Sequence, residues 1–550
     1  MKTTRDVLLV VPPMYQSGRI PDYNPKEPMG LTYLTASLRE VGIDVEILDA
    51  DVFALTIQET VSQICERRAK VIGFTVMQRA LPSVKLMVEG LRKNQCSAHI
   101  CCGGITATLS TEQLLTHIPG IDSIVLGEGD VSFRILVERV IGGHNWHDLS
   151  GLSYMGASVI TNAPSSKPDL DILPRASRDL LPHCLQMTNY ATVLASRGCY
   201  GVCTFCSNCS FERMSLGPNW RPRNPAEVVD EIEQLRRDYN VTVFKFNDAN
   251  LFGPGRAGRR HVVDLCREVI RRQLNDLHLM GFCRSNDVDE EVALLMRRAG
   301  FERLLVGIES ADPEILRVFR KGESLATILH MIEVLRNAGI DIVPGFMIFN
   351  PYSTIGSVAR DLDFLERFGF TPTLSKALRV FDGTPIQALL LSEGRLIWRN
   401  PLEGYHEYLM DPVLAAIYMA LKTISVEWID SLKKAYQDEF WGIKKAPAFN
   451  QRKSFDRLSR LLFQVEARTL RALISWAEHG WSLQDVIDLV TEVRERLSNL
   501  EQLVVTESGL AKARLDVSSF SVKDMANRTH SILKTKVFRT FPEQYRWKED

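Results

Sequence analysis

Three cysteines near the middle of the chain have a spacing that can support redox chemistry. Cys199, Cys203 and Cys206 follow the pattern C-x3-C-x2-C, and a further cysteine, Cys209, comes three residues later. Three thiolates can hold a four-iron four-sulfur (4Fe-4S) cluster by three of its corners, whereas a cluster that only transfers electrons normally takes four. The remaining iron then has an open position. The spacing therefore predicts a cluster at which a small molecule can bind and react.

The residues around the cysteines predict a tight loop that brings the sulfurs together. An apolar strand is expected over residues 191–195, and Gly198 and Gly201 give the following backbone the freedom that such a loop needs. Two other interpretations compete with the open cluster. Cys209 could complete a closed zinc or cluster site of four thiolates, or the cysteines could be buried apolar residues. We expect Cys209 not to be a ligand, and a partly polar loop is a poor place for core cysteines.

The pattern has an aromatic residue, Phe205, just before the last of the three cysteines, and it resembles the signature of the radical S-adenosylmethionine (radical SAM) enzymes. The resemblance implies that the amino and carboxylate groups of S-adenosylmethionine chelate the open iron. It also implies that one electron from an external donor, such as a flavodoxin or ferredoxin, cleaves this molecule to a 5'-deoxyadenosyl radical.

Length and composition indicate an intracellular enzyme of several domains. A chain of 550 residues is too long for one core and should form about three domains. The net charge of -1 gives no electrostatic footprint for nucleic acid or an anionic membrane surface. No stretch approaches the roughly 18 uninterrupted apolar residues of a membrane span, and the 11 scattered cysteines do not indicate a secreted disulfide framework. We therefore predict a cytoplasmic protein that binds neither nucleic acid nor membranes.

The predicted domains follow from changes in pattern along the chain. They are an α/β domain over 1–160, a Pro-rich linker over 161–185, a second α/β domain over 186–395 and a helical domain over 396–550. In the last domain, apolar residues recur at helical spacing. Aromatic residues there could line a substrate pocket, although tryptophans at such spacing are more often core. These residues are Trp398, Tyr405, His406, Tyr408, Trp428, Trp441, Trp476 and Trp481.

The first domain shows apolar runs that alternate with helical patterns, at 7–11, 45–49, 71–76, 99–102 and 123–126. This alternation predicts a Rossmann-like, doubly wound parallel sheet. Ligands of such sheets bind at the carboxyl ends of the strands. Polar and glycine-rich residues fall at those ends, at 75–78, 103–108 and 127–130.

Four motifs in this domain resemble, as an ordered set, the cobalamin-binding domain that precedes the radical SAM core in one large subfamily. They are Pro-Pro after the first strand, Gly-Leu-x-Tyr-Leu from Gly30, Gly-Gly-x-Thr-Ala-Thr from Gly103 and Gly-Glu-Gly-Asp from Gly127. The resemblance implies that cobalamin contacts Thr75, Val76, Met77, Gly103, Gly104, Thr106, Gly127 and Glu128. The Asp-x-His-x-x-Gly motif of some cobalamin proteins is absent, and no histidine precedes His99. We therefore expect base-off cobalamin without a histidine ligand to cobalt.

The second α/β domain is expected to form a partial barrel. Six apolar runs each end in polar or charged residues, which in a parallel barrel gather on one catalytic face. They lie at 191–195, 241–248, 277–282, 303–308, 340–348 and near Leu378. Six strands rather than eight imply an open (β/α)6 barrel, the fold that the radical SAM resemblance also implies.

Residues at these strand ends resemble the S-adenosylmethionine contacts of the radical SAM family. Gly-Ile-Glu-Ser, from Gly307, resembles the family's ribose-binding Gly-x-Glu-Ser, and Asp248 and Asn250 stand where the family often carries Asp-Asp-Asn. Arg284 could pair with the methionine carboxylate, since a guanidinium fork suits that anion, or it could be an ordinary salt-bridged arginine. The residues implied to bind S-adenosylmethionine are Phe205, Asp248, Asn250, Arg284, Glu309, Ser310 and Met347.

Together these features predict a cobalamin-dependent radical SAM methyltransferase. The resemblance implies that one S-adenosylmethionine methylates cob(I)alamin and that a second one gives the radical that activates the substrate. The substrate radical then takes the methyl group from methylcobalamin at an unactivated carbon, or at phosphorus. The substrate is expected to be a small biosynthetic intermediate, with a peptide also possible. Two alternatives remain open: a cyclase or rearrangement enzyme with the same cofactors, and an iron-sulfur or corrinoid-binding protein without turnover.

Overall fold

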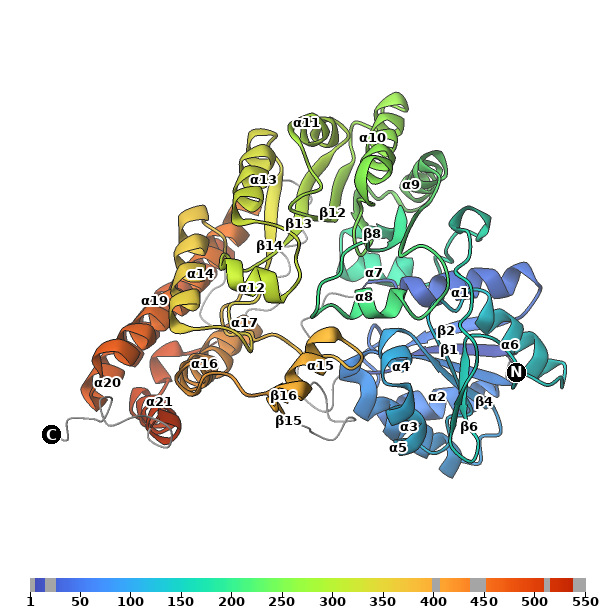
Figure 1. Ribbon diagram of the computed structural model, residues 1–550, viewed down its shortest axis with the longest axis horizontal. Helices are drawn as coiled ribbons and strands as arrows, with labels where there is room; N and C mark the ends of the chain where they lie inside the picture. Colours follow the sequence, from blue (N-terminus) through green and yellow to red (C-terminus); the bar gives the residue numbers. More distant parts are fainter. Residues whose placement is uncertain (1–4, 15–25, 398–405, 436–451, 509–514, 538–550) are drawn as a thin grey trace.

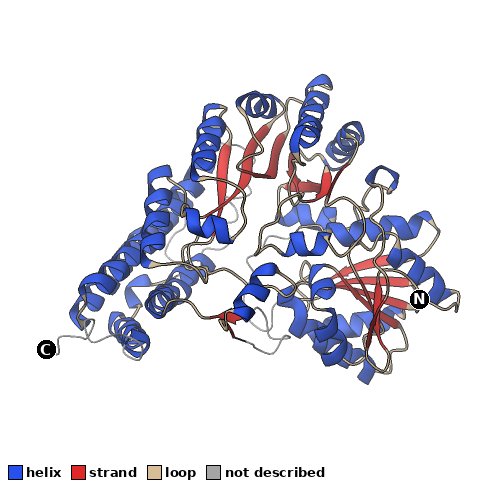
Figure 2. Cartoon of the chain, viewed as in Figure 1, coloured by secondary structure: helices blue, strands red, loops and turns tan. Residues whose placement is uncertain are grey.

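A computed structural model describes residues 5–14, 26–397, 406–435, 452–508 and 515–537. Figure 1 shows two α/β units, one from the N-terminal part and one from the middle of the chain, and a group of long helices from the C-terminal part. The expected fold class is confirmed. Figure 2 shows that most strands lie in the two α/β units and that helices dominate the rest.

The first unit contains a seven-stranded sheet in the order β2-β1-β3-β4-β5-β6-β7. The five predicted apolar runs form its parallel part. The strands are β1 (Val7–Val11), β2 (Val45–Asp49), β3 (Val71–Thr75), β4 (His99–Gly103), β5 (Ser123–Val125), β6 (Leu152–Met155) and β7 (Val159–Thr161). The last two pair antiparallel and were not predicted. They form a hairpin around Gly156. The apolar runs of these two strands are short and alternate too little to be recognised as strands in the sequence.

Helices cover both faces of this sheet. On one face, α1 (Met29–Glu40) and α6 (Ser132–Ile141) pack against Val7, Leu9 and Cys101. On the other, α2 (Ile57–Arg67), α3 (Leu81–Lys93) and α5 (Thr111–His117) pack against the alternate residues of the same strands. The carboxyl ends of the parallel strands continue into short turns and helices, η1 (Gln78–Ala80) after β3 and α4 (Ile105–Leu109) after β4.

The second unit contains a parallel sheet in the order β14-β13-β12-β11-β8. Its strands are β8 (Tyr190–Val193), β11 (Val243–Phe246), β12 (His278–Arg284), β13 (Phe301–Glu309) and β14 (Asp341–Phe346). The helices that follow the strands are α9 (Pro225–Tyr239), α10 (Gly255–Arg271), α11 (Glu290–Arg298), α12 (Pro313–Val318), α13 (Leu325–Asn337) and α14 (Ile355–Phe368). The linker contributes η2 (Leu170–Ile172) and α7 (Leu181–Met187).

The predicted sixth barrel strand, near Leu378, is reduced to a single parallel bridge between Phe349 and Ala377. The backbone on either side has other partners. The Leu374 amide donates to the buried carboxylate of Glu466 at 2.9 Å, and Val380 forms an antiparallel bridge with His406. Because these contacts draw the segment away from β14, the barrel ends after five full strands.

Helix α15 (Pro385–Ser392) ends the second unit. The helical domain consists of α16 (Pro412–Ile424), a π-helical turn over Ser425–Ile429, α17 (Asp430–Ala435), α19 (Arg452–His479), α20 (Leu483–Ser508), η5 (Val517–Ser519) and α21 (Val522–Val537). A short two-stranded sheet, β15 (Leu396–Ile397) with β16 (Glu407–Tyr408), lies before it in sequence. Trp428 is buried in the core, and Trp476 and Trp481 pack against it, as expected for core tryptophans. Trp398, Tyr405 and Trp441 lie outside the described residues, and His406 is buried rather than facing open space.

Among the residues that the structure describes, one apolar helical stretch, Pro412–Leu432, is long and apolar enough to cross a membrane by length and composition. It is 56% buried within the folded chain. Its side chains belong to the same core as α19 and α20. This stretch therefore has the burial of a core helix.

Candidate cluster and cofactor site

The cysteine loop starts from a short hairpin that is held by a buried carboxylate. Strands β9 (Ser196–Gly198) and β10 (Trp220–Pro222) pair antiparallel on either side of the loop. Asp248, just after β11, accepts hydrogen bonds from the Ala195 amide at 3.3 Å, from the Ser196 hydroxyl at 2.6 Å and from the Ser196 amide. Burial raises the pKa of Asp248 to about 6. This carboxylate is committed to the backbone that leads into the loop, so a contact with S-adenosylmethionine stays a prediction for it.

The environment of the loop stabilises thiolates, the form that ligates iron. Cys206 is the N-cap of α8 (Ser207–Glu212). A hydrogen bond from the Cys209 thiol, together with the amides of Cys209 and Asn208, lowers the pKa of Cys206 to about 6. The Cys209 thiol also lowers the pKa of Cys199, with help from the Gly201 amide, whose nitrogen lies 3.3 Å from the Cys199 sulfur.

Burial raises the pKa of Cys203, but two cations face this sulfur, Lys321 and Arg284. Within the described part of the chain, no three His, Cys, Asp or Glu side chains converge closely enough to hold a single metal ion. A cluster has iron at separate corners, so its ligands need not converge on one point. Three thiols on one loop, two of them with lowered pKa values, are therefore suitable ligands for a cluster.

A group of buried charges lies beside the loop, at the ends of β12 and β13 and in the segment after α12. Arg284 donates from Nη1 to the Cys203 sulfur at 3.3 Å and forms an ion pair with Glu323 at 2.7 Å. Lys321 lies 3.6 Å from Glu323 and 3.7 Å from Glu309. The sequence singled out Arg284 and Glu309 but missed Lys321 and Glu323. Their only signal was the charged run after α12, which is typical of a solvated surface.

Glu309 has an unusual backbone conformation, with φ at +69°. Few residues other than glycine adopt positive φ, and such strain is concentrated at functional sites. Gly307 makes the carboxylate's position possible, because a Cβ there would lie 2.6 Å from Glu309 Oε1 and 2.8 Å from Lys321 Nζ. Burial raises the pKa of Glu309 to about 7, although the Lys321 ammonium acts in the opposite direction.

The other predicted S-adenosylmethionine contacts fall into two groups. Phe205 and Met347 pack against the same small apolar cluster, and Phe205 meets Phe319 edge to face at 5.0 Å. The Met347 amide also donates to the Glu309 carbonyl at 2.9 Å, which places β14's end beside the strained residue. By contrast, Ser310 donates its hydroxyl to Asp361 at 2.9 Å. Asn250 is buried and accepts from the Phe252 amide at 3.3 Å.

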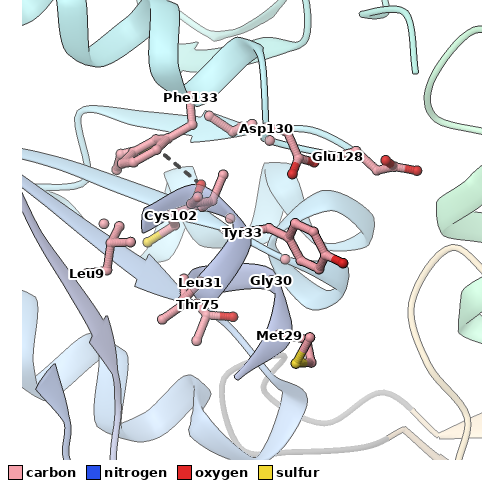
Figure 3. A pocket seen from close by; sticks show the side chains of 18 of the residues that line it. Leu9, Met29, Gly30, Leu31, Tyr33, Thr75, Cys102, Glu128, Asp130 and Phe133 are labelled. Atoms are coloured by element: carbon pink, nitrogen blue, oxygen red, sulfur yellow. Dashed lines mark hydrogen bonds between the residues drawn. The ribbon is translucent and has the colours of Figure 1, made fainter. Parts of the chain in front are cut away.

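A cavity of about 240 Å³ lies in the first unit, at the carboxyl ends of its central strands. Leu9, Gly73 and Cys101 stand in register across β1, β3 and β4 and line it. Figure 3 shows Leu9, Tyr33 and Phe133 around this space, with Glu128 and Asp130 to one side. Gly73 is needed for room, since a Cβ there would lie 2.9 Å from Leu9 Cδ2 and 3.0 Å from Phe133 Cζ.

Five of the eight residues predicted to contact cobalamin line this cavity, namely Thr75, Gly103, Gly104, Gly127 and Glu128. The other three, Val76, Met77 and Thr106, are not among its lining residues. Val76 is fully buried in the opposite core layer, Met77 is 47% exposed at the strand end, and Thr106 is buried. Strand alternation separates Val76 from Thr75, because successive side chains point to opposite faces.

Arg197 joins the cavity to the cysteine loop and was not predicted. It lines the cavity, lies only two residues before Cys199, and pairs with Asp130 at 2.7 Å and with Glu128 at 2.9 Å. Its guanidinium stands over the Tyr33 ring, 4.6 Å from the centroid. The Tyr33 hydroxyl is buried without a hydrogen-bond partner among the described residues, so it is available to a polar group of a ligand.

Comparison with known proteins agrees with this two-part site. Residues 23–137 match the family described as B12 binding domain, and residues 193–365 match the radical SAM superfamily. The chain combines a B12-binding domain with a radical SAM domain. Most residues that line the cavity lie within the first match and the cysteine loop lies within the second, so each cofactor has a site with suitable residues.

Two curated relatives and one solved structure align with most of the chain. An uncharacterized methyltransferase of Pyrococcus horikoshii is 26% identical over 78% of this chain and 91% of its own length. An anaerobic magnesium-protoporphyrin IX monomethyl ester cyclase of Synechocystis is 27% identical over 71% of this chain and 75% of its own length. The cobalamin-dependent S-adenosylmethionine radical enzyme OxsB, solved with aqua-cobalamin, has a TM-score of 0.72 at 17% identity, over 96% of this chain and 84% of OxsB. That likeness establishes the fold.

The three-cysteine site predicts a specific pattern of cluster loss. Replacement of Cys199, Cys203 or Cys206 by alanine should abolish cluster loading on anaerobic reconstitution, because each removes one of three thiolate ligands. The Cys209→Ala variant should retain one 4Fe-4S cluster per chain and is the matched control. Iron and sulfide analysis with electron paramagnetic resonance (EPR) of the reduced protein measures both. Loss of the cluster in the Cys209 variant would instead support a closed four-thiolate site.

Filling the cavity should weaken cobalamin binding. In Cys101→Phe the added ring would occupy space between β4, α1 and α6. Overpacking of a filled site costs about 1–3 kcal/mol, or roughly 5- to 150-fold in affinity. Cys101→Ala should bind as the wild-type protein does. Titration with hydroxocobalamin measures both variants, and reconstituted cluster content checks that the second unit is intact. Unchanged affinity in the phenylalanine variant would place cobalamin elsewhere.

Proposed function

We propose that the chain is a cytoplasmic methyltransferase that uses cobalamin and a radical SAM cluster together to methylate a small molecule. The observation that carries this proposal is the junction at Arg197. This one side chain lines the cavity of the B12-binding domain and belongs to the hairpin that precedes the cluster loop. A protein that used the two cofactors independently would not need this adjacency.

The residues around the cluster loop have distinct proposed roles. The ammonium of Lys321 and the carboxylate of Glu309 provide opposite charges 3.7 Å apart beside the loop. This pair suits S-adenosylmethionine, which carries a zwitterionic methionine part and a ribose. The apolar group with Phe205 and Met347 offers a face for adenine. Asp248 holds the loop's first residues in place through the backbone. An external flavodoxin or ferredoxin supplies electrons.

In the B12-binding domain, the apolar cavity receives the nucleotide tail of cobalamin, and glycines at the strand ends allow the close approach that the tail requires. Gly104 adopts φ +91° and Gly127 φ +69° there. When bound, cobalamin supplies a cobalt centre that can accept and donate a methyl group. The chain's contribution would be to hold this cofactor through the residues at the strand ends and Arg197, beside the cluster loop. With no imidazole at cobalt, the cofactor is proposed to bind base-off.

A cyclase with the same cofactors is the second candidate, and one observation favours keeping it. The Synechocystis relative named as a cyclase aligns with 71% of this chain, almost as much as the relative named as a methyltransferase. The residues at both cofactor sites are compatible with either outcome. The fate of the methyl group separates them.

The cobalt environment gives the first functional test. No histidine precedes His99 in the sequence, and His99 itself lies at the start of β4, at the opposite end of the strand from the cavity. We therefore expect a base-off absorption spectrum, and no nitrogen hyperfine coupling from an axial imidazole in the EPR spectrum of cob(II)alamin. Strong axial nitrogen coupling would contradict the proposed ligand environment.

The second functional test follows the methyl group. With S-adenosylmethionine carrying a trideuterated methyl group, a reductant and the substrate, a methyltransferase should give product heavier by the labelled methyl, together with 5'-deoxyadenosine. A cyclase should release 5'-deoxyadenosine but leave the product unlabelled. A protein that only binds the cofactors should give neither labelled product nor 5'-deoxyadenosine. Mass spectrometry of both products distinguishes the three outcomes, and the Cys203→Ala variant is the inactive control.

A further inference from the structure

Arg284 lies inside the cysteine loop instead of pointing toward open space at the strand end. It is the last residue of β12 and is 7% exposed. One terminal nitrogen, Nη1, donates to the Cys203 sulfur at 3.3 Å. The other, Nη2, pairs with Glu323 at 2.7 Å and donates to the Lys321 carbonyl. Each end of the guanidinium fork thus has a partner that belongs to the chain itself.

The loop is shaped around this guanidinium. A Cβ on Gly201 would lie only 2.6 Å from Nη1, so the backbone between Cys199 and Cys203 approaches the arginine as closely as it can. On the other side, the Arg284 guanidinium stands 5.4 Å from the centroid of the Tyr200 ring. A residue enclosed by a glycine, an aromatic ring, a sulfur, a carbonyl and a carboxylate has one defined position.

The position of Arg284 affects the electrostatics of the cluster, because its partner Cys203 is a proposed cluster ligand. Hydrogen bonds to ligand sulfurs and nearby charge are among the factors that set the reduction potential of an iron-sulfur cluster. A donor on the sulfur stabilises the reduced cluster, which carries one more negative charge than the oxidised one. Glu323 balances part of the positive charge, but it pairs with Nη2, while Nη1 is the atom that contacts sulfur.

We propose that Arg284 is a positioning residue whose guanidinium donates to the cluster ligand Cys203 and raises the reduction potential of the cluster. This role rests on the proposed radical SAM function and replaces the expected ion pair with the methionine carboxylate. In the redox step itself, one electron from an external reductant enters the oxidised cluster and no bond of the protein breaks. The guanidinium stays protonated throughout.

The test is a redox titration of the reconstituted protein with dithionite, followed by EPR, in the absence of S-adenosylmethionine. Arg284→Gln removes the charged donor, so the cluster should become harder to reduce by about tenfold in equilibrium constant, or 59 mV for one electron. Arg284→Lys keeps the charge but loses the planar fork, and its shift should be smaller. Arg259→Gln is the control, because Arg259 pairs with Asp289 on the surface.

A second variant keeps the test decisive if Arg284→Gln fails to hold a cluster. Gly201→Ala adds one methyl group against Nη1 without changing any charge, and it should lower the potential in the same direction. Unchanged potentials in both the lysine and the alanine variants would overturn the proposal. So would an unchanged potential accompanied by lost binding of S-adenosylmethionine, which would instead place Arg284 on the methionine carboxylate. Loss of the cluster in Cys203→Ala tests the radical SAM site itself. Failure of the proposed function can therefore be distinguished from failure of the proposed role of Arg284.

Discussion

A buried ion-pair group between the two α/β units is the constraint on which the site depends. Arg197 pairs with Glu128 and Asp130, and Arg221, its cross-strand neighbour, pairs with Glu128 as well. Removing one partner of such a pair costs about 3–5 kcal/mol, because the remaining charge is buried alone. The group therefore holds the cavity, which Arg197 lines, beside the hairpin that leads into the cluster loop.

The second unit assembles its chemistry from the ends of neighbouring strands. Asp248 follows β11, Arg284 ends β12 and Glu309 ends β13. Because these strands are parallel, their carboxyl ends meet at one edge of the sheet, and residues far apart in sequence become neighbours. The three side chains make different contacts there. Asp248 holds backbone, Arg284 contacts sulfur and Glu309 stands beside Lys321.

The sequence predicted the elements better than the partners of individual side chains. Apolar runs and glycines located the parallel strands of both sheets, because alternation and turn chemistry are local signals. Pairings such as Arg197 with Asp130, 67 residues apart, have no local signal. The missing sixth strand has the same cause, since the competing contact comes from Glu466, 92 residues beyond Leu374. At Val76, a shift of one residue along the chain is enough to turn the side chain into the opposite core layer, away from the cavity.

The backbone strain at Glu309 is best explained by what it does to the carboxylate. A non-glycine residue at φ +69° costs about 1–3 kcal/mol, and continued extended backbone would avoid this cost. The strained conformation instead keeps the side chain beside Lys321, over a glycine that leaves it room. Burial still raises the carboxyl's pKa to about 7 despite the ammonium, so the chain alone compensates the charge incompletely. A ligand that donates hydrogen bonds to this carboxylate, as ribose hydroxyls do, would complete the compensation, which is a physical reason for the strand to end this way.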